Sequence, residues 1–187
     1  MAKIINEENP MMNGTSGSIG NLTFMTRNGQ TISWPKRGPN KKPPTEEQVA
    51  VQVKFERFAA YAQEAIADPE KKLLYAKAAK KGQSAFNAAF RDAARPPRVS
   101  EIDTRQYRGL VGGVIRFLVK DVVRVESVKV KILSEAGAEL EQGDAVSGIG
   151  NYWKYTATVA NPAMLGSRVL VTATDLPGNI TEAEFEI

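Results

Sequence analysis

The feature that most constrains this chain is an alternation of apolar and polar residues over 114–132, VIRFLVKDVVRVESVKVKI. Val128, Val130 and Ile132 fall on one side of an extended chain, and lysines fall between them on the other. Successive side chains of a strand point to opposite faces, so this pattern predicts strands with one buried and one solvated face. The segment therefore indicates an antiparallel β-structure rather than a helix.

Further strand-like runs follow up to the end of the chain. Turn signals such as Ala136-Gly137 and Gly143-Asp144 separate them. About seven short strands with a turn roughly every 8 to 12 residues are typical of an antiparallel sandwich. In such a fold Trp153 is expected to pack in the core between two sheets, with a sugar-stacking tryptophan as the alternative. We expect this domain to cover residues 99–187.

The chain ends in VLVTATDLPGNITEAEFEI, and its final hairpin carries Asp175, Gly178 and Asn179. This ending resembles the last two strands of bacterial immunoglobulin-like modules. The resemblance implies an immunoglobulin-like β-sandwich that makes contacts rather than performs catalysis, as a spacer, an adhesin repeat or a decoration on a virion or tail. The whole layout also resembles short uncharacterised bacterial proteins, and that resemblance implies no activity.

The first 98 residues differ in character from the rest. Residues 1–17 contain few apolar side chains and predict a flexible arm. In residues 18–34 the pair Asn28-Gly29 is typical of a type I′ turn, because both central residues of that turn need positive φ.

The two strands beside that turn predict a docking hairpin. We expect Leu22 and Phe24 before the turn to pair with Ile32 and Trp34 after it. A two-stranded ribbon is marginal in water, so its apolar face is expected to dock on the downstream helices or on a neighbouring subunit.

Residues 35–44 predict an extended connector, because four prolines exclude a helix and a central strand. Four cations lie among these prolines, so the segment is either a phosphate-contacting arm or a solvated linker. The cations are Lys36, Arg37, Lys41 and Lys42.

Two helices are predicted next. Thr45 is the expected N-cap of the first, and Gln48 three residues later completes a capping-box pattern. Asp68-Pro69 ends this helix and opens a second one, which we expect to run to about Ala94. Frequent alanines on both apolar stripes predict close contact in an antiparallel helical hairpin. The predicted fold class is therefore α+β, with a hairpin and helical-hairpin domain over 18–98.

Residues 68–92 resemble the last helix of a high-mobility-group box. The shared features are Glu70, Lys71 and Lys72 at the opening, followed by Tyr75, Ala79 and Phe86. The resemblance implies bending of DNA from the minor groove by an inserted apolar wedge. Whatever the ancestry, the lysines are expected to form one basic helix face: Lys71, Lys72, Lys77, Lys80 and Lys81.

The chain contains neither cysteine nor histidine. This excludes disulfides, thiolate metal sites, cysteine nucleophiles and Ser-His-Asp triads, so we expect no enzymatic activity, cofactor or metal. One acidic cluster remains, and it predicts a solvated strand edge rather than a calcium site. Its members are Glu135, Glu139, Glu141 and Asp144.

The net charge of +4 hides an asymmetry. Residues 1–98 hold 16 basic and 9 acidic side chains, giving +7, whereas 99–187 hold 9 and 12, giving −3. The opposite net charges of the two halves indicate either an anionic partner for the basic half or head-to-tail contact between copies. The sequence shows no signal peptide and no apolar run long enough for a bilayer, so we expect a cytoplasmic protein or part of a particle assembled there.

These observations predict a structural protein that assembles with itself, or docks on a virion, tail or filament, through protein–protein contacts. The alternative is a nucleic-acid-binding protein that uses its basic N-terminal half. The candidate contacts of that half are Lys36, Arg37, Lys41, Lys42, Lys71, Lys72, Lys80 and Lys81.

Overall fold

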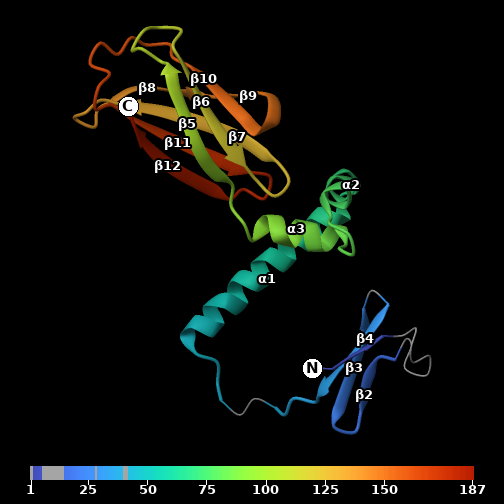
Figure 1. Cartoon of the computed structure of the whole chain (residues 1–187). Helices are drawn as coiled ribbons and strands as arrows, with labels where there is room; N and C mark the ends of the chain where they lie inside the picture. The colour runs from blue at the N-terminus through green and yellow to red at the C-terminus, as the bar shows by residue number, and fades with distance from the viewer. Residues whose placement is uncertain (1, 6–14, 28, 40–41) are drawn as a thin grey trace. The chain divides into compact units, whose positions relative to one another are not determined.

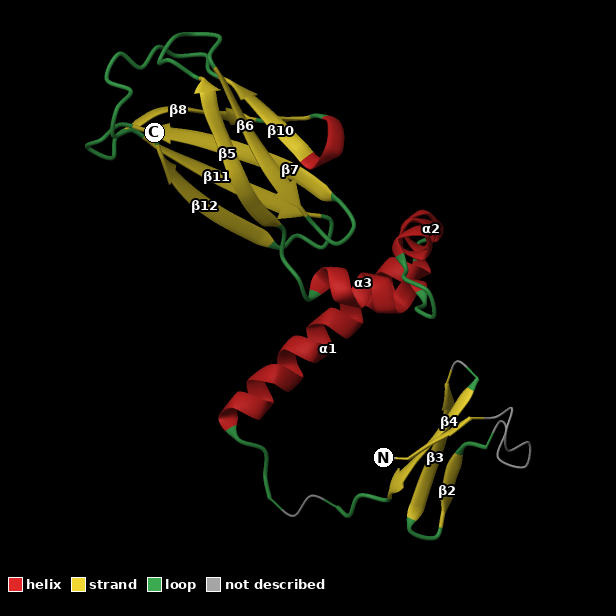
Figure 2. Ribbon diagram, in the orientation of Figure 1, coloured by secondary structure: helices red, strands yellow, loops and turns green. Residues whose placement is uncertain are grey.

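The computed structural model describes residues 2–5, 15–27, 29–39 and 42–187. Within them the chain forms three α-helices and three antiparallel four-stranded sheets, which confirms the α+β class (Figures 1 and 2). The chain divides into two compact units, Met1–Val51 and Gln52–Ile187. Every described helix is too short or too polar to span a lipid bilayer.

The N-terminal unit contains one antiparallel sheet in the order β1-β4-β3-β2. Its strands are β1 (Ala2–Ile5), β2 (Gly17–Ile19), β3 (Leu22–Arg27) and β4 (Gln30–Pro35). The predicted ribbon is therefore the centre of a wider sheet. The expected flexible arm over 1–17 is wrong for β1, which pairs with β4, and for the start of β2. Backbone hydrogen bonds hold these short edge strands, and such bonds leave little trace in composition.

The connection between β3 and β4 is the predicted two-residue turn. Arg27 lies opposite Gln30, so only two residues link the strands. Gly29 has φ of 75°, the positive value that favours glycine. Asn28, its predicted partner in the turn, lies outside the described residues.

The prediction that Leu22, Phe24, Ile32 and Trp34 share one face of this hairpin is wrong. The turn sets the register so that Met25 lies opposite Ile32. Directly opposed residues share a face, so Leu22 and Phe24 lie on one face, whereas Ile32 and Trp34 lie on the other. The expected pairing was off by one residue, and a shift of one residue exchanges the faces of a strand.

Helix α1 (Glu46–Ala67) begins at the predicted capping box. The Thr45 amide donates to Gln48 Oε1 at 3.1 Å, and the Gln48 amide donates to Thr45 Oγ1 at 3.3 Å. Asp68 then caps the next helix by accepting from the amides of Glu70 and Lys71. Both predicted helix starts are therefore confirmed.

The predicted second helix is broken into α2 (Pro69–Ala78) and α3 (Ala85–Ala93). Gly82 between them has φ of 79°, and Ser84 caps α3 by accepting from the Asn87 amide at 3.3 Å. A left-handed glycine followed by a new cap stops one helix and starts another. The expected two-helix hairpin is thus a packing of three helices, with close alanine contacts as predicted. The buried core is Ala62, Ala65, Tyr75, Ala88 and Ala89.

The rest of the C-terminal unit consists of two four-stranded sheets, in the orders β5-β6-β10-β9 and β12-β11-β7-β8. A short 3₁₀ turn, η2 (Ile149–Asn151), precedes β10. The predicted strands are found, and β9 is an additional one. The strands are β5 (Arg98–Gln106), β6 (Val114–Lys120), β7 (Val125–Leu133), β8 (Glu139–Asp144), β9 (Val146–Ser147), β10 (Tyr152–Thr156), β11 (Arg168–Asp175) and β12 (Ile180–Glu186).

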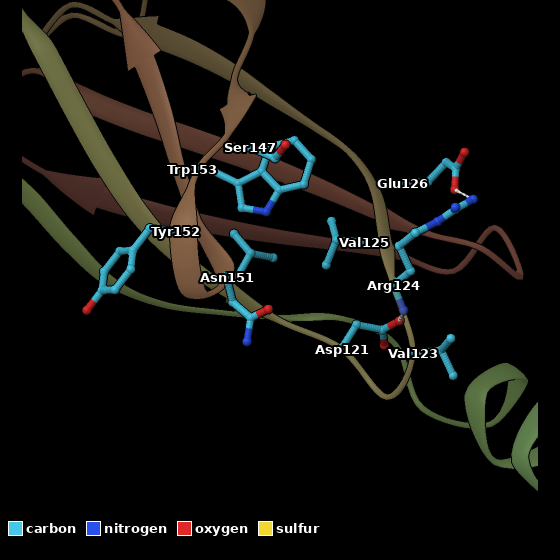
Figure 3. Close-up of a pocket in the computed structure, with 11 residues that line it drawn as sticks. Asp121, Val123, Arg124, Val125, Glu126, Ser147, Asn151, Tyr152 and Trp153 are labelled. Carbon is cyan, nitrogen blue, oxygen red and sulfur yellow. Dashed lines mark hydrogen bonds and ion pairs between the residues drawn. The ribbon is translucent and has the colours of Figure 1, made fainter. Parts of the chain in front are cut away.

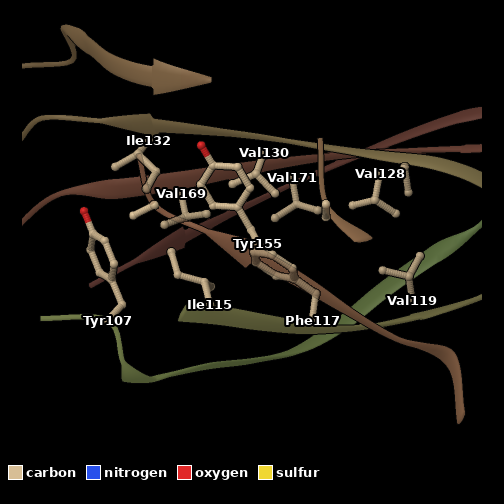
Figure 4. Close-up of a cluster of buried hydrophobic side chains, with 13 residues drawn as sticks. Tyr107, Ile115, Phe117, Val119, Val128, Val130, Ile132, Tyr155, Val169 and Val171 are labelled. Carbon is tan, nitrogen blue, oxygen red and sulfur yellow. The ribbon is translucent and has the colours of Figure 1, made fainter. Parts of the chain in front are cut away.

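The two sheets face each other across one hydrophobic core, shown in Figure 4. Val128, Val130 and Ile132 of β7 are fully buried, as their alternation with lysines predicts. They pack with apolar side chains of β6, β10 and β11. Trp153 is partly buried and packs against this core, but it also lines a surface hollow.

The acidic residues of β8 do not all lie at a solvated edge as expected. Glu141 is buried, and its Oε2 accepts hydrogen bonds from Tyr155 Oη at 3.1 Å and from the amides of Thr158 and Val159 at 2.8 and 3.2 Å. Glu139 on the same strand instead forms an exposed ion pair with Lys131 at 2.9 Å. Glu141 therefore fixes the chain that follows β10.

We predict that Glu141→Ala lowers the free energy of unfolding by about 2–3 kcal/mol, because it leaves buried donors unpaired. Glu139→Ala, the matched control, should cost less than about 1 kcal/mol, since it removes an exposed ion pair. Urea denaturation of both variants measures the difference. Equal losses would show that Glu141 does not anchor the loop.

Candidate functional surfaces

The second face of the N-terminal sheet carries an apolar groove of about 570 Å³. The groove is lined by Met25, Ile32, Trp34, Pro35 and Arg37. Met25 is 41% exposed, and Ile32 and Trp34 are partly exposed. The groove therefore brings together two residues of the predicted docking hairpin and one predicted cation.

Met25 was missed in the sequence, although the two-residue turn places it opposite Ile32. Leu22 and Phe24 lie on the other face of the sheet and do not reach the groove. Of the remaining connector cations, Lys36 and Lys42 are exposed, and Lys41 lies outside the described residues.

The helix lysines do not form the single basic face that was expected. Lys71 and Lys72 lie in the first turn of α2, whereas Lys80 and Lys81 lie in the loop between α2 and α3. The break at Gly82 causes this separation. Lys80 instead lines a cleft where α3 and the following segment approach the sandwich.

A second hollow, of about 450 Å³, opens at one end of the sandwich beside Trp153 (Figure 3). Figure 3 shows Asn151, Tyr152 and Trp153 among the residues that line this hollow. Arg124 at its rim pairs with Glu126 at 2.8 Å. An indole beside an amide has the chemistry for stacking on a sugar, which is the alternative expected for Trp153.

The helices and the sandwich meet around a group of buried carboxylates. Asp92 is fully buried, and its Oδ2 accepts from Tyr75 Oη at 2.8 Å; Tyr75 Oη also lies 2.8 Å from Tyr61 Oη. Asp92 Oδ1 has no hydrogen-bond partner among the described residues. Burial, together with the nearby charges of Asp121 and Asp175, raises the pKa of Asp92 to about 7, against the hydrogen bond from Tyr75.

The group formed by Asp92, Tyr75 and Tyr61 resembles an acid–base catalytic site, but Asp92 is not accessible to solvent. Burial also raises the pKa of Asp175, which accepts from the Asn179 amide and side chain. Burial, with the hydrogen bonds to Tyr61 and Asp92, raises the pKa of Tyr75 far above its ordinary value. A substrate cannot reach a fully buried carboxylate, so we interpret the group as structural. No three acidic side chains among the described residues converge to hold a metal ion.

We predict that the protein loses stability as pH rises from about 4 to about 7. The pKa of Asp92 is higher in the folded than in the unfolded state, so the folded state binds the proton more tightly and is penalised once the proton leaves. Asp92→Asn should therefore raise the free energy of unfolding at about pH 8, and should remove about 2–3 kcal/mol of the difference between about pH 5 and pH 8.

Chemical denaturation at both pH values tests this expectation. Asp144→Asn, at an exposed position on β8, is the control and should leave the pH dependence unchanged. If the free energy of unfolding of Asp92→Asn depended on pH as strongly as that of wild type, other groups would be responsible for the pH dependence.

No family model matches the chain, and no curated protein matches it. Among solved structures, it is similar to the catalytic module of the multi-modular glycogen-degrading pneumococcal virulence factor SpuA, at 14% identity with a TM-score of 0.29. The same module in complex with an inhibitor gives 14% identity and a TM-score of 0.28. In both cases the similarity covers 43% of this chain and 13% of the other chain. A likeness of this size carries no argument about function.

Proposed function

We propose that the protein is a non-enzymatic assembly protein that acts through contacts with further copies of itself, alone or within a larger particle such as a virion, tail or filament. The observation that carries the proposal is the apolar groove of Met25, Ile32, Trp34 and Pro35.

The N-terminal unit spans Met1–Val51, and a unit of about 50 residues has little apolar material with which to cover both faces of a sheet. On one face Phe24 and Thr31 are buried, whereas Leu22 at the end of that face is 45% exposed. The other face keeps Met25 and Trp34 at the surface. Contiguous exposed apolar side chains of this kind are typical of protein–protein contact sites.

Helix α1 supports the same proposal. Val51, Val53 and Phe55 in its first half are 65%, 59% and 59% exposed. Apolar residues at successive odd positions do not follow one helix face, so the helix presents apolar surface on more than one side. Such a helix gains by packing against another protein surface.

Charge favours a second copy as the partner. Residues 52–98 hold 10 basic and 5 acidic side chains, a net +5, whereas 99–187 carry −3. Opposite charges on two parts of one chain favour head-to-tail contact between copies.

We further infer that the sandwich is immunoglobulin-like. The sheet orders β5-β6-β10-β9 and β12-β11-β7-β8 correspond, in chain order, to strands ABED and GFCC′ of that fold. The correspondence supports a contact module, in line with the resemblance of the final hairpin.

We predict that wild-type protein forms oligomers whose mass rises with concentration. Met25→Glu combined with Trp34→Glu should weaken this association at least tenfold, because it places charges on the apolar contact. Light scattering or analytical ultracentrifugation over a concentration series measures the effect.

Leu165→Glu is the matched control, because Leu165 is an exposed apolar residue far from the N-terminal sheet in sequence. It should leave association unchanged. A wild-type protein that stays monomeric throughout, or an equal effect of the control, would rule out the groove as the contact.

A further inference from the structure

A basic cleft of about 850 Å³ lies in the C-terminal unit where α3 leads into the sandwich. We define the basic cleft by five cations from four different segments, opposed by only two carboxylates, Asp121 and Glu182. Lys80 comes from the α2–α3 loop, Arg91 from α3, and Lys120 from the end of β6. The linking segment between α3 and β5, with the first residue of β5, supplies the last two, Arg95 and Arg98.

These cations are not neutralised within the described part of the chain. Arg91 donates to Gln83 Oε1 at 2.9 Å and to the Ala78 carbonyl at 3.4 Å, and both acceptors are uncharged. Lys80, Arg95, Arg98 and Lys120 form no ion pair with any described residue. Four cations of the sandwich are paired instead: Arg105 with Asp103, Arg124 with Glu126, Lys131 with Glu139, and Arg168 with Glu184.

The walls of the basic cleft are fixed relative to each other. Asn179 Nδ2 donates to the carbonyls of Asp92 and Ala93 at the end of α3, both at 3.3 Å. Thr181 Oγ1 of β12 donates to the Pro97 carbonyl at 2.6 Å. The cations are therefore presented by a preorganised surface rather than by a mobile tail, which lowers the entropic cost of binding a ligand.

The number and type of the cations point to a polyanion. Three of the five are arginines, whose planar guanidinium groups suit bidentate contact with phosphate oxygens. A single phosphate needs two or three such donors, whereas a row of phosphates engages all five. Carboxylates on β12 of a second copy fit less well, because the central one, Glu184, is already paired with Arg168.

We propose that the basic cleft binds the phosphate backbone of a nucleic-acid duplex, independently of base sequence. This binding site is additional to the assembly contact. Pro96, Pro97 and Val122 line the cleft between the cations, and no aromatic side chain lines it. Unpaired bases therefore find no ring on which to stack, whereas backbone contacts require only the cations.

Fluorescence anisotropy of the full chain with a labelled duplex of about 20 base pairs, long enough to present a row of phosphates to all five cations, tests the proposal. Wild-type protein should bind at low salt, with a slope of log K against log salt of about −4.5 for five cations. Arg95→Glu with Arg98→Glu should weaken binding at least tenfold and reduce the slope by about 2. Duplexes of two unrelated sequences should bind within a few-fold of each other.

Two control variants locate the site. Lys129→Glu with Lys154→Glu makes the same charge change on exposed strand positions of the sandwich, and Lys36→Glu with Arg37→Glu makes it in the connector. Both should retain binding within a few-fold of wild type. Circular dichroism and thermal melting should show that all variants fold.

Several results would overturn the proposal. If the wild-type protein did not bind the duplex at low salt, the proposal would be wrong. If the Lys129/Lys154 variant lost as much affinity as the Arg95/Arg98 variant, binding would be due to the overall charge of the protein rather than to the cleft. Loss confined to the Lys36/Arg37 variant would move the site to the connector. If the corresponding single strand bound more tightly than the duplex, the proposal that the ligand is a duplex would be wrong. Dissociation of oligomers by the cleft variant without any duplex binding would make the cleft a contact between copies.

Discussion

The side-chain amide of Asn179 is the interaction on which the C-terminal unit most depends. It donates to Asp175 Oδ2 at 2.8 Å and to the last carbonyls of α3, so one group holds the final hairpin and a helix end together. Moving α3 away from the sandwich would leave several buried polar groups unpaired, at a cost of about 1–3 kcal/mol for each. The basic cleft exists as a defined surface because this joint is rigid.

The contact between α3 and the sandwich also buries an acidic side chain, which lowers stability when it is ionised. Asp92 is fully buried beside Tyr75, and burial together with two neighbouring carboxylates raises its pKa to about 7. A buried acid is a poor source of stability, but its hydrogen bonds require one arrangement of the helices. We interpret the network as a device for geometric specificity. The C-terminal unit therefore presents its cations on a rigid surface, whereas the N-terminal unit presents apolar side chains.

Local patterns predicted those parts of the fold that local interactions determine. The alternation around Val130 predicted the core strands, and the spacing of Thr45 and Gln48 predicted the start of α1. The break at Gly82 was missed because the apolar spacing continues on both sides of it. The cleft was missed because its cations lie far apart in sequence; the β5–β6 pairing, which places Arg98 opposite Lys120, brings Lys120 close to Arg95. In the hairpin, the turn alone fixed the register, and the face of Trp34 follows from that register.

The central claim is that another copy covers the apolar face of the N-terminal sheet. Trp34 lies in that groove, and Trp153 is the only other tryptophan in the chain. In a Trp153→Phe variant, tryptophan emission therefore reports on Trp34 alone and can be followed together with mass as concentration rises. We expect the emission to shift to shorter wavelength as the mass increases, because the indole leaves water. Emission that stays constant while oligomers form would contradict the account.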